Sequence, residues 1–234
     1  MKKLLLSITA LFLFNCATLV THIENIDNYT QFEIIVPSSH FSFPGSRNKM
    51  LIMGDYNIVK TNKITFSADE VSYTLNGQSY SSSVDGRYEF LKGETCLYKF
   101  EIITDKSIKK VSSVVSIENR RRFIRLINND AAVKNKIELD ALNADIFLSV
   151  SDEDIGNLTI SRYRSGNANS SQNSNWQYET GFIITIDDEE YGILAFYPKP
   201  KLYRNNRLNK IIDENFEDKV ILYILMAYEG FKSE

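Results

Sequence analysis

A strand-and-turn pattern around Asn76-Gly77 most constrains what this chain can fold into. Val71, Tyr73 and Leu75 alternate with polar residues, so they share one face of an extended strand. The Asn-Gly pair that follows tolerates the positive φ angles of a two-residue type I′ turn. Residues 78–83 then supply a returning strand. The pattern predicts a β-hairpin, and therefore a fold in which antiparallel pairing contributes strongly.

The rest of the chain favours strands as well. It contains 13 Tyr and 14 Phe, residues that suit the half-buried surface of a sheet. Asp85-Gly86 predicts a second turn. Residues 118–129 fit a strand or a helix, and the pattern leaves that choice open. Further strands are expected at residues 31–36, 49–53, 96–103, 111–117, 145–150, 157–163, 177–186 and 191–197.

The C-terminal segment carries apolar residues at steps of three and four, which predicts a helix over about residues 206–229 with Gly230 as its C-terminal cap. These residues are Leu208, Ile211, Ile212, Phe216, Val220, Tyr223 and Ala227. Because residues 220–228 are apolar on all sides, we expect the helix to pack on one face of a sheet. The predicted fold class is mostly β (α+β): one antiparallel, sandwich-like domain over residues 31–234 with this helix packed on it.

The N-terminus has the pattern of an export signal. Lys2 and Lys3 precede an apolar run over residues 4–14, and Asn15-Cys16 follows. The run is about half of the roughly 20 residues that span a bilayer, which disfavours a transmembrane anchor. The Ala-x-Ala site of an ordinary secretory signal is also missing, so simple secretion is the weaker alternative.

Leu13-Phe14-Asn15-Cys16 resembles the lipobox of bacterial lipoproteins, and its large residues before the cysteine are similar to the relaxed boxes of spirochaetal lipoproteins. The resemblance implies that residues 1–15 are a signal peptide and that residues 16–30 are a lipidated lead. Cys16 would carry a diacylglyceryl thioether and a further acyl chain such as palmitate. Such an anchor would hold the protein stably in a bilayer. The expected location is the outer membrane of the cell envelope, with the periplasmic and the surface face both open.

Charge and cysteine content exclude several classes of protein. Without Lys2 and Lys3 the chain has 25 basic and 30 acidic side chains, a net charge of −5, which disfavours binding to nucleic acid. Lipidation of Cys16 would leave Cys96 as the single thiol, so no internal disulfide is expected. Cys96 lies in a strand-like pattern, which favours a buried apolar role over a nucleophilic one.

Catalytic motifs are scarce. His22 and His40 are the only histidines, and neither has a carboxylate or a cysteine at metal-ligand spacing. The sequence lacks the Gly-x-Ser-x-Gly motif of α/β-hydrolases and a glycine-rich phosphate loop. These observations disfavour a zinc enzyme, a serine hydrolase and a nucleotide-binding protein, and no cofactor is expected.

Two kinds of charged cluster remain as candidate sites. Asp152, Asp154, Asp187 and Asp188 offer hard oxygen ligands for a cation such as calcium, or are simply solvated turns. Arg120, Arg121, Arg122 and Arg125 suit an anion or a sulfated glycan, or form a surface ion-pair patch.

Two functions are compatible with the sequence. The first is a membrane-anchored envelope lipoprotein that acts as a non-catalytic binding or structural module for an envelope or host protein or a glycan. The second is an envelope hydrolase that uses paired carboxylates. A flat aromatic face or an exposed strand edge would favour the first, and a concave pocket lined by carboxylates the second.

Overall fold

A computed structural model describes residues 21, 23–37, 47–61, 71–75, 78–112, 116–127, 136–139, 145–165, 178–208 and 213–232 of the chain. These residues form two antiparallel sheets with one C-terminal helix packed on them. The predicted fold class is therefore confirmed.

One sheet, sheet A, has six strands in the order β1-β13-β12-β11-β10-β9. A short 3-10 helix, η1 (Ile26–Asn28), leads into it. In that order the strands are β1 (Tyr29–Glu33), β13 (Lys201–Asn205), β12 (Glu189–Ala195), β11 (Tyr178–Ile186), β10 (Gly156–Ser165) and β9 (Ile146–Asp152).

The other sheet, sheet B, has seven strands, and six of them follow the order β2-β3-β5-β6-β7-β8. The seventh strand, β4, pairs with residues 78–82 in the N-terminal part of β5. The strands are β2 (Arg47–Met53), β3 (Tyr56–Thr61), β4 (Val71–Leu75), β5 (Gln78–Lys92), β6 (Thr95–Lys110), β7 (Ser116–Ile127) and β8 (Lys136–Leu139). Residues 118–127 are thus strand, which settles the open choice for that segment. Val111 and Ser112, expected in a strand, lie between β6 and β7.

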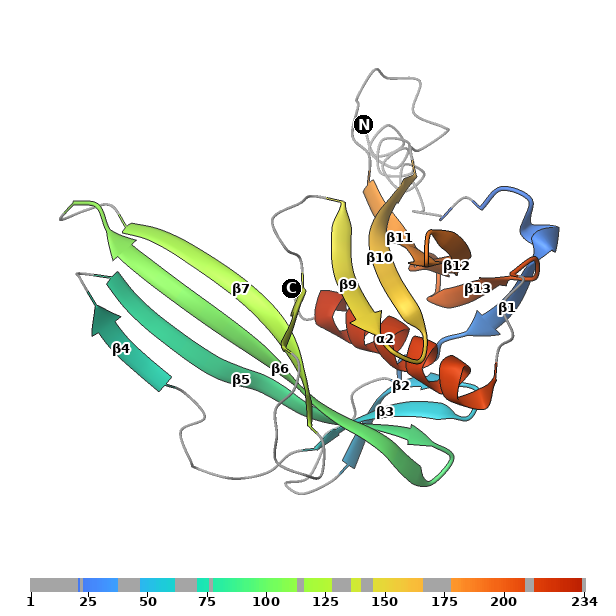
Figure 1. Cartoon of the computed structure of the whole chain (residues 1–234), viewed down its shortest axis with the longest axis horizontal. Helices are drawn as coiled ribbons and strands as arrows, with labels where there is room; N and C mark the ends of the chain where they lie inside the picture. The colour runs from blue at the N-terminus through green and yellow to red at the C-terminus, as the bar shows by residue number, and fades with distance from the viewer. Residues whose placement is uncertain are drawn as a thin grey trace, which may run out of the picture.

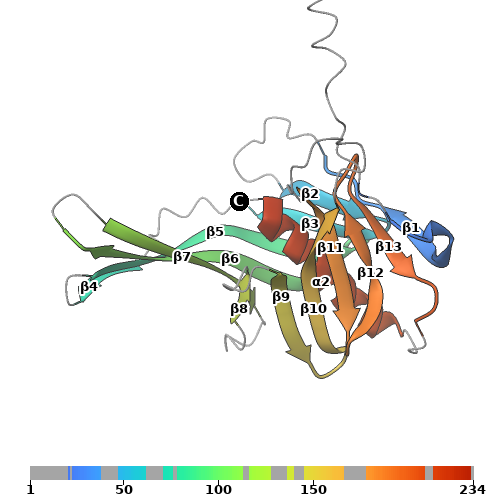
Figure 2. The same cartoon turned by 90° about the horizontal axis from the view of Figure 1, so that it is seen from above.

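The helix α2 (Glu214–Lys232) lies between the two sheets (Figures 1 and 2). Residues 220–230 are all buried, and residues 220–228 belong to one core cluster with side chains of both sheets. The predicted burial of residues 220–228 is confirmed. The helix was expected to pack on one face of a single sheet, but it packs against both sheets. A helix that is apolar on all sides must be buried on all sides.

The predicted helix boundaries are wrong at both ends. Residues 206–208, predicted as helical, lie outside the helix and directly after β13, which pairs with β1 and β12. The helix begins after Asp213, whose carboxylate accepts a 2.8 Å hydrogen bond from the Phe216 N–H as an N-cap. Gly230 lies inside the helix rather than at its cap. A Cβ there would lie 2.7 Å from Cδ1 of Leu139, so glycine permits close packing against β8.

The hairpin prediction around Asn76-Gly77 agrees with the strand pairing, since Leu75 lies opposite Gln78 at the junction of β4 and β5. Asn76 and Gly77 themselves lie outside the described residues. The turn predicted at Asp85-Gly86 is wrong, because β5 continues through it with a β-bulge. A side chain at Gly86 would collide with the Tyr88 ring, which explains why a glycine occupies the bulge.

Beyond this bulge, sheet B projects away from α2 and sheet A in both views (Figures 1 and 2). We call this projection the arm and define it as β4 with residues 78–84, 104–110 and 116–121. Residues 72–75 and 116–121, on its two outer strands, are all exposed.

Candidate functional site

The described fold begins earlier than the predicted domain boundary at residue 31. The Thr21 hydroxyl donates a 2.7 Å hydrogen bond to the carbonyl of Thr180, and Thr21 is buried. Its N–H lies 3.5 Å from the Tyr197 carbonyl oxygen, and β1 starts at Tyr29. The segment assigned as a lead therefore contributes to sheet A, although Cys16 itself lies outside the described residues.

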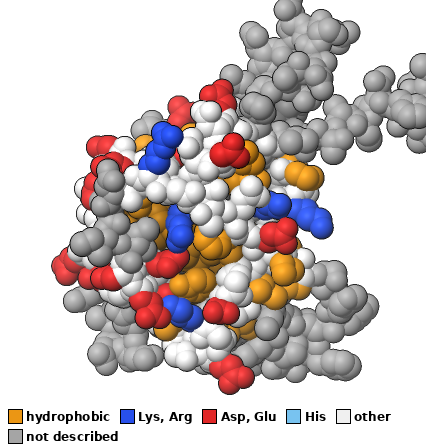
Figure 3. All heavy atoms as spheres, turned by 90° about the vertical axis from the view of Figure 1, so that its right-hand side faces the viewer, with side chains coloured by type: hydrophobic (Ala, Val, Ile, Leu, Met, Phe, Trp, Pro, Cys, Tyr) orange, Lys and Arg blue, Asp and Glu red, His pale blue; other side chains and the backbone are white. Residues whose placement is uncertain are grey.

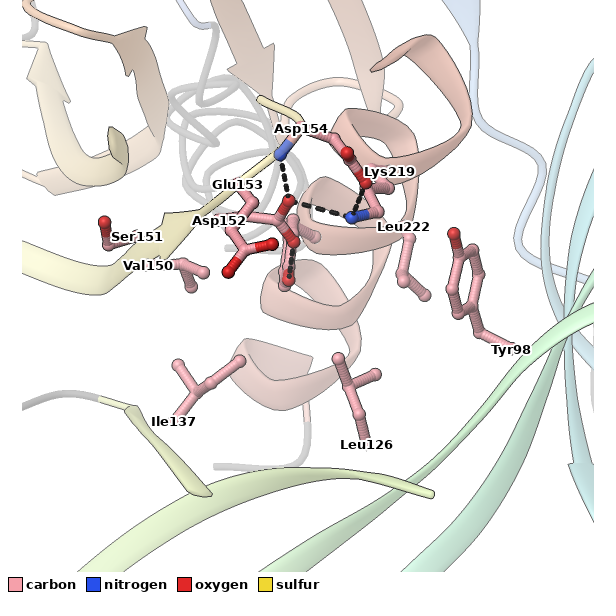
Figure 4. A pocket seen from close by; sticks show the side chains of 11 residues that line it. Tyr98, Leu126, Ile137, Val150, Ser151, Asp152, Glu153, Asp154, Lys219 and Leu222 are labelled. Carbon is pink, nitrogen blue, oxygen red and sulfur yellow. Dashed lines mark hydrogen bonds and ion pairs between the residues drawn. The ribbon is translucent and has the colours of Figure 1, made fainter. Parts of the chain in front are cut away.

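A cleft of about 410 Å³, the Lys219 cleft, lies beside the first half of α2 (Figure 4). Leu126 of β7 and Ile137 of β8 form its apolar wall on sheet B, and Leu222 extends that wall along the helix. The β9–β10 turn with Asp152 and Asp154 forms the opposite side. The cleft thus combines an apolar wall with a charged rim.

A single ammonium bridges two of the carboxylates of the Lys219 cleft. The Lys219 ammonium donates to Asp152 over 2.8 Å and also to Asp154. The Tyr223 hydroxyl donates to the second oxygen of Asp152 over 3.0 Å. Burial opposes ionisation of Asp152, but the hydrogen bonds from Lys219, the Asp154 N–H and Tyr223 hold the pKa of its carboxyl below the usual value. A general acid needs a raised pKa, so Asp152 is poorly suited to that role.

A second cleft, the Tyr191 cleft, lies on the opposite side of α2 and has a volume of about 490 Å³. Glu214, Glu217 and Ile221 face it from the helix, at a spacing that places them on one helical face. Its walls come from both sheets: Phe32, Met53, Tyr56 and Tyr191. The face of the molecule that carries β1 and β13 exposes hydrophobic side chains among acidic and basic ones (Figure 3).

A lysine also bridges two carboxylates beside the Tyr191 cleft. The Lys92 ammonium donates to Glu214 over 2.6 Å and to Asp218 over 2.9 Å, and these bonds raise the pKa of Lys92. The Tyr56 hydroxyl donates to Asp218 over 2.7 Å. The two clusters differ in origin: here the carboxylates come from the helix, whereas in the Lys219 cleft the helix supplies the lysine. Together they fix the first half of α2 to both sheets.

The hydroxyl of Tyr191 is a buried polar group without a hydrogen bond among the described residues. The residue as a whole is fully buried. Burial raises the pKa of Tyr191 to about 12 and the charge of Glu217 adds to this shift, whereas the charge of Arg204 and a weak hydrogen-bonding contact with its side chain oppose it. That contact falls short of hydrogen-bond geometry, and the Arg204 guanidinium donates to Glu217 over 2.9 Å. A buried hydroxyl without a partner is costly, so this group calls for a physical explanation.

The acidic residues predicted as cation ligands have other partners in the structure. Asp187 and Asp188 form the two-residue β11–β12 turn, and both have positive φ, as a type I′ turn requires. The Asp187 carboxylate accepts a 2.8 Å hydrogen bond from the Asn157 N–H, which joins this turn to the β9–β10 turn. In the described part of the chain, no three His, Cys, Asp or Glu residues are grouped to hold a metal ion.

The four arginines predicted as an anion site do not form one cluster. They lie on β7, where successive side chains point to opposite faces of the sheet. Arg120 pairs with Glu118 at 3.4 Å, and Arg121 lies 3.8 Å from Glu138.

The other two arginines contact the body of the protein. Arg122 donates to the Gly230 carbonyl at the end of α2 over 2.8 Å. Arg125 and Arg87 both bind the buried carboxylate of Glu101. The arrangement fits the ion-pair interpretation of this segment better than a single anion-binding patch.

Cys96 is exposed on β6, so the expectation that it is buried is wrong. The strand pattern around it is real, but Cys96 lies near the end of β6 and next to the β5–β6 turn, where both faces meet solvent. His22 and His40 lie outside the described residues.

Sequence reasoning missed the Tyr191 cleft. Phe32, Tyr56 and Tyr191 are far apart in the chain and share no local motif. The apolar run over residues 191–197 marks Tyr191 as a strand residue, but it cannot show that its hydroxyl would lack a partner.

Comparisons with protein-family models, with curated proteins and with solved structures find no match for this chain. Among the described residues, no helix is long and apolar enough to cross a membrane.

Proposed function

We propose that this protein is a membrane-anchored envelope lipoprotein and a non-catalytic binding module that takes a short glycan in the Tyr191 cleft. The observation that carries the proposal is the buried hydroxyl of Tyr191, which lines this cleft and has no partner among the described residues. The hydroxyl is closed to solvent in this structure, so a ligand would reach it only as the side chains lining the cleft move apart. A hydrogen bond to the ligand would then remove the cost of leaving the hydroxyl unsatisfied.

The proposed anchor is the acylated Cys16, and its distance from the fold supports the tether. Four residues separate Cys16 from Thr21, so the chain spans five residue steps and reaches at most about 18 Å between them. Thr21 bonds to Thr180 at one end of β11, and the acidic turns lie at the other end, roughly 20 Å away along the strand. Lipidation would hold the body close to the outer membrane, with the acidic turns at the far end of β11 turned away from it.

The ligand class follows from the chemistry of the cleft. Its volume of about 490 Å³ lies in the usual range of small-molecule sites. Asp55, Glu214 and Glu217 make its rim rich in hydrogen-bond acceptors, so a suitable ligand brings hydroxyl or ammonium donors. Tyr56 and Phe32 supply flat apolar surface. A short neutral or amine-bearing glycan has both properties. The lining carries three carboxylates against the single ammonium of Lys92, so an anionic sugar is less suited to the cleft.

The alternative is a hydrolase with paired carboxylates, since both clefts are concave and carry carboxylates. In the Tyr191 cleft, Lys92 binds Glu214 and Arg204 binds Glu217, which ties both carboxylates to cations. Asp152 and Asp154 both line the Lys219 cleft, but both bind Lys219. The depressed pKa of Asp152 disfavours proton donation near neutral pH.

The tether is tested with Cys16→Ala. We expect the variant to lose labelling by palmitate and to leave the membrane fraction, because the thioether and the signal-peptidase site both need the cysteine. Cys96→Ser is the matched control and should remain lipidated. Unchanged labelling of Cys16→Ala would refute the lipoprotein assignment.

Ligand binding is tested with Tyr191→Phe against Tyr223→Phe, using glucose, glucosamine and glucuronate as probes in calorimetric titrations. Glucose and glucosamine should bind the wild-type protein, glucuronate should not, and Tyr191→Phe should weaken binding. Without ligand, Tyr191→Phe should raise the free energy of unfolding by about 1 kcal/mol, because it removes an unsatisfied hydroxyl.

Tyr223→Phe should have the opposite effects on stability and on probe binding. It removes a hydrogen bond to Asp152, so it should lower the free energy of unfolding by about 1 kcal/mol and leave probe binding unchanged. Equal probe binding by Tyr191→Phe and the wild type, or no binding of any probe, would exclude the proposed site.

A further inference from the structure

The strand β4 forms one edge of the arm and is unusually open to pairing. Residues 72–75 are all exposed, and Tyr73 and Leu75 each leave 57% of their surface accessible. One edge of β4 pairs with β5, and within the described residues no strand pairs with its other edge. An exposed, uncharged edge of this kind can accept another strand through its free backbone N–H and C=O groups.

The opposite edge of the arm is protected. There, residues 116–121 of β7 lie beyond the part of the strand that pairs with β8. This segment carries Glu118, Arg120 and Arg121, and charged side chains on an edge strand discourage pairing with another chain. β4, by contrast, contains only Val, Ser, Tyr, Thr and Leu. The two edges therefore differ in whether they resist a further strand.

The sequence of β4 is chemically symmetric about its centre. Val-Ser-Tyr-Thr-Leu reads as apolar, hydroxyl, aromatic, hydroxyl and apolar in either direction. In an antiparallel pair of two β4 strands centred on Tyr73, Ser72 would lie opposite Thr74 and Val71 opposite Leu75. Like chemistry would meet on both faces, and no like charges would be brought together. A two-fold interface between identical chains requires this kind of self-complementary surface.

We propose that β4 pairs antiparallel with β4 of a second copy of this chain, with Tyr73 at the two-fold axis. The two arms then form one continuous sheet. This inference concerns the assembly of the protein and does not depend on the ligand of the Tyr191 cleft.

The aromatic side chains of the arm support this register. The rings of Tyr73 and Tyr80 lie opposite one another on neighbouring strands, with centroids 5.0 Å apart and planes 15° from parallel. Pairing at the two-fold axis adds the second Tyr73 and Tyr80 to the same row. Cross-strand aromatic pairs stabilise a sheet, so the row is favourable for the dimer. Tethering both copies to one membrane would raise their effective concentration.

The register is tested by crosslinking Tyr73→Cys in a Cys96→Ser background. The full-length lipidated protein is treated in its membrane with a short thiol-specific bifunctional reagent. Residues directly opposite across a strand pair have Cβ atoms about 5 Å apart, so a crosslinked dimer should form. Ile117→Cys in the same background is the control, since it is exposed on the other edge of the arm. Equal dimer yields from the two cysteines would overturn the assignment to β4.

A second measurement keeps Tyr73 intact. The soluble Cys16→Ala chain is studied by sedimentation equilibrium with and without the double change Ser72→Lys and Thr74→Lys. The double change places lysines opposite lysines and should raise the dimer dissociation constant about ten-fold or more. Ile117→Lys with Asn119→Lys adds the same charge to the other edge and should leave the constant unchanged. A Cys16→Ala chain that stays monomeric at all concentrations, together with no Tyr73→Cys dimer in membranes, would refute the proposal.

Discussion

Residues 220–230 of α2 are buried throughout, whereas Tyr73, Leu75 and Ile117 of the arm leave more than half of their surface exposed. Both regions contain apolar residues at the period of their secondary structure. The helix places them between two sheets, and the arm places them on a sheet whose distal strands project from the body (Figure 2). Periodicity thus predicts the type of an element, but not whether another layer covers it.

The difference identifies where stability and where recognition reside. Burial of α2 joins both sheets in one core cluster, which is the main source of folding free energy. The arm buries little of its distal surface, so it contributes little to the stability of the body. Apolar residues retained at an exposed sheet edge are better explained by pairing with another chain.

The largest expected effect is the loss of α2. A chain truncated after Asn209 should fail to unfold cooperatively, because both sheets would lose the helix that covers them. Several large side chains at about 1.5–3 kcal/mol each approach the whole stability of a domain. Circular dichroism with urea denaturation measures this. A truncated chain that stays monomeric, soluble and cooperatively folded would show that the helix is dispensable for the core.

A single cavity in the helix should have the next largest effect. Ile224 is fully buried. Ile224→Ala should lower the free energy of unfolding by about 2–5 kcal/mol, since it removes buried methyl groups and leaves a cavity. Urea denaturation of the soluble Cys16→Ala protein gives the value. A loss below 1 kcal/mol would mean that the helix is less tightly enclosed than its burial indicates.

The Lys219 cluster should contribute less. Lys219→Met should lower the free energy of unfolding by about 1 kcal/mol at neutral pH, a modest value because Asp154 is half exposed and water screens the pair. The pKa of Asp152 is lowered in the folded state, so its contribution is present above the unfolded value near pH 4 and is lost as the pH falls further.

The contribution of Lys219 to the free energy of unfolding depends on pH in the opposite sense to that of Asp152. Burial opposes protonation of Lys219, but hydrogen bonds from its ammonium to Asp152 and Asp154 raise its pKa. Its contribution is therefore lost as the pH rises above about 10.5. Lys219→Met should weaken the loss of unfolding free energy both below about pH 4 and above about pH 10.5. An unchanged loss of stability at low pH would show that Lys219 does not lower the pKa of the Asp152 carboxyl.

The smallest effect is expected in the arm. Ile117→Ala makes the same chemical change as Ile224→Ala at an exposed position, and it should alter the free energy of unfolding by no more than about 0.5 kcal/mol. The two variants are compared in the same denaturation experiment. If Ile117→Ala lowered the free energy of unfolding nearly as much as Ile224→Ala, then Ile117 would be covered in solution. Another molecule would have to pack on the β7 edge of the arm, which is not the edge assigned to dimer formation.

Several features of this protein were determined by the sequence alone. Alternation in residues 71–75 predicted a strand, and the apolar circumference of residues 220–228 predicted a buried helix. These are local patterns, set by the geometry of one element. The lipobox at Cys16 is a local signal of the same kind, and it remains a prediction.

Tertiary structure alone decided the features that need distant residues. It placed residues 201–205 in a strand between β1 and β12, and it enclosed α2 between two sheets. Pairing with β6 also made residues 118–127 a strand rather than a helix, which turns Arg121 and Arg122 to opposite faces of the sheet. The fold left the Tyr191 hydroxyl without a hydrogen-bond partner among the described residues. Backbone pairing, enclosure and hydrogen-bond satisfaction all depend on groups brought together from distant parts of the chain. Local periodicity holds no information about those neighbours, so the clefts and the open edge of the arm emerged only from the fold.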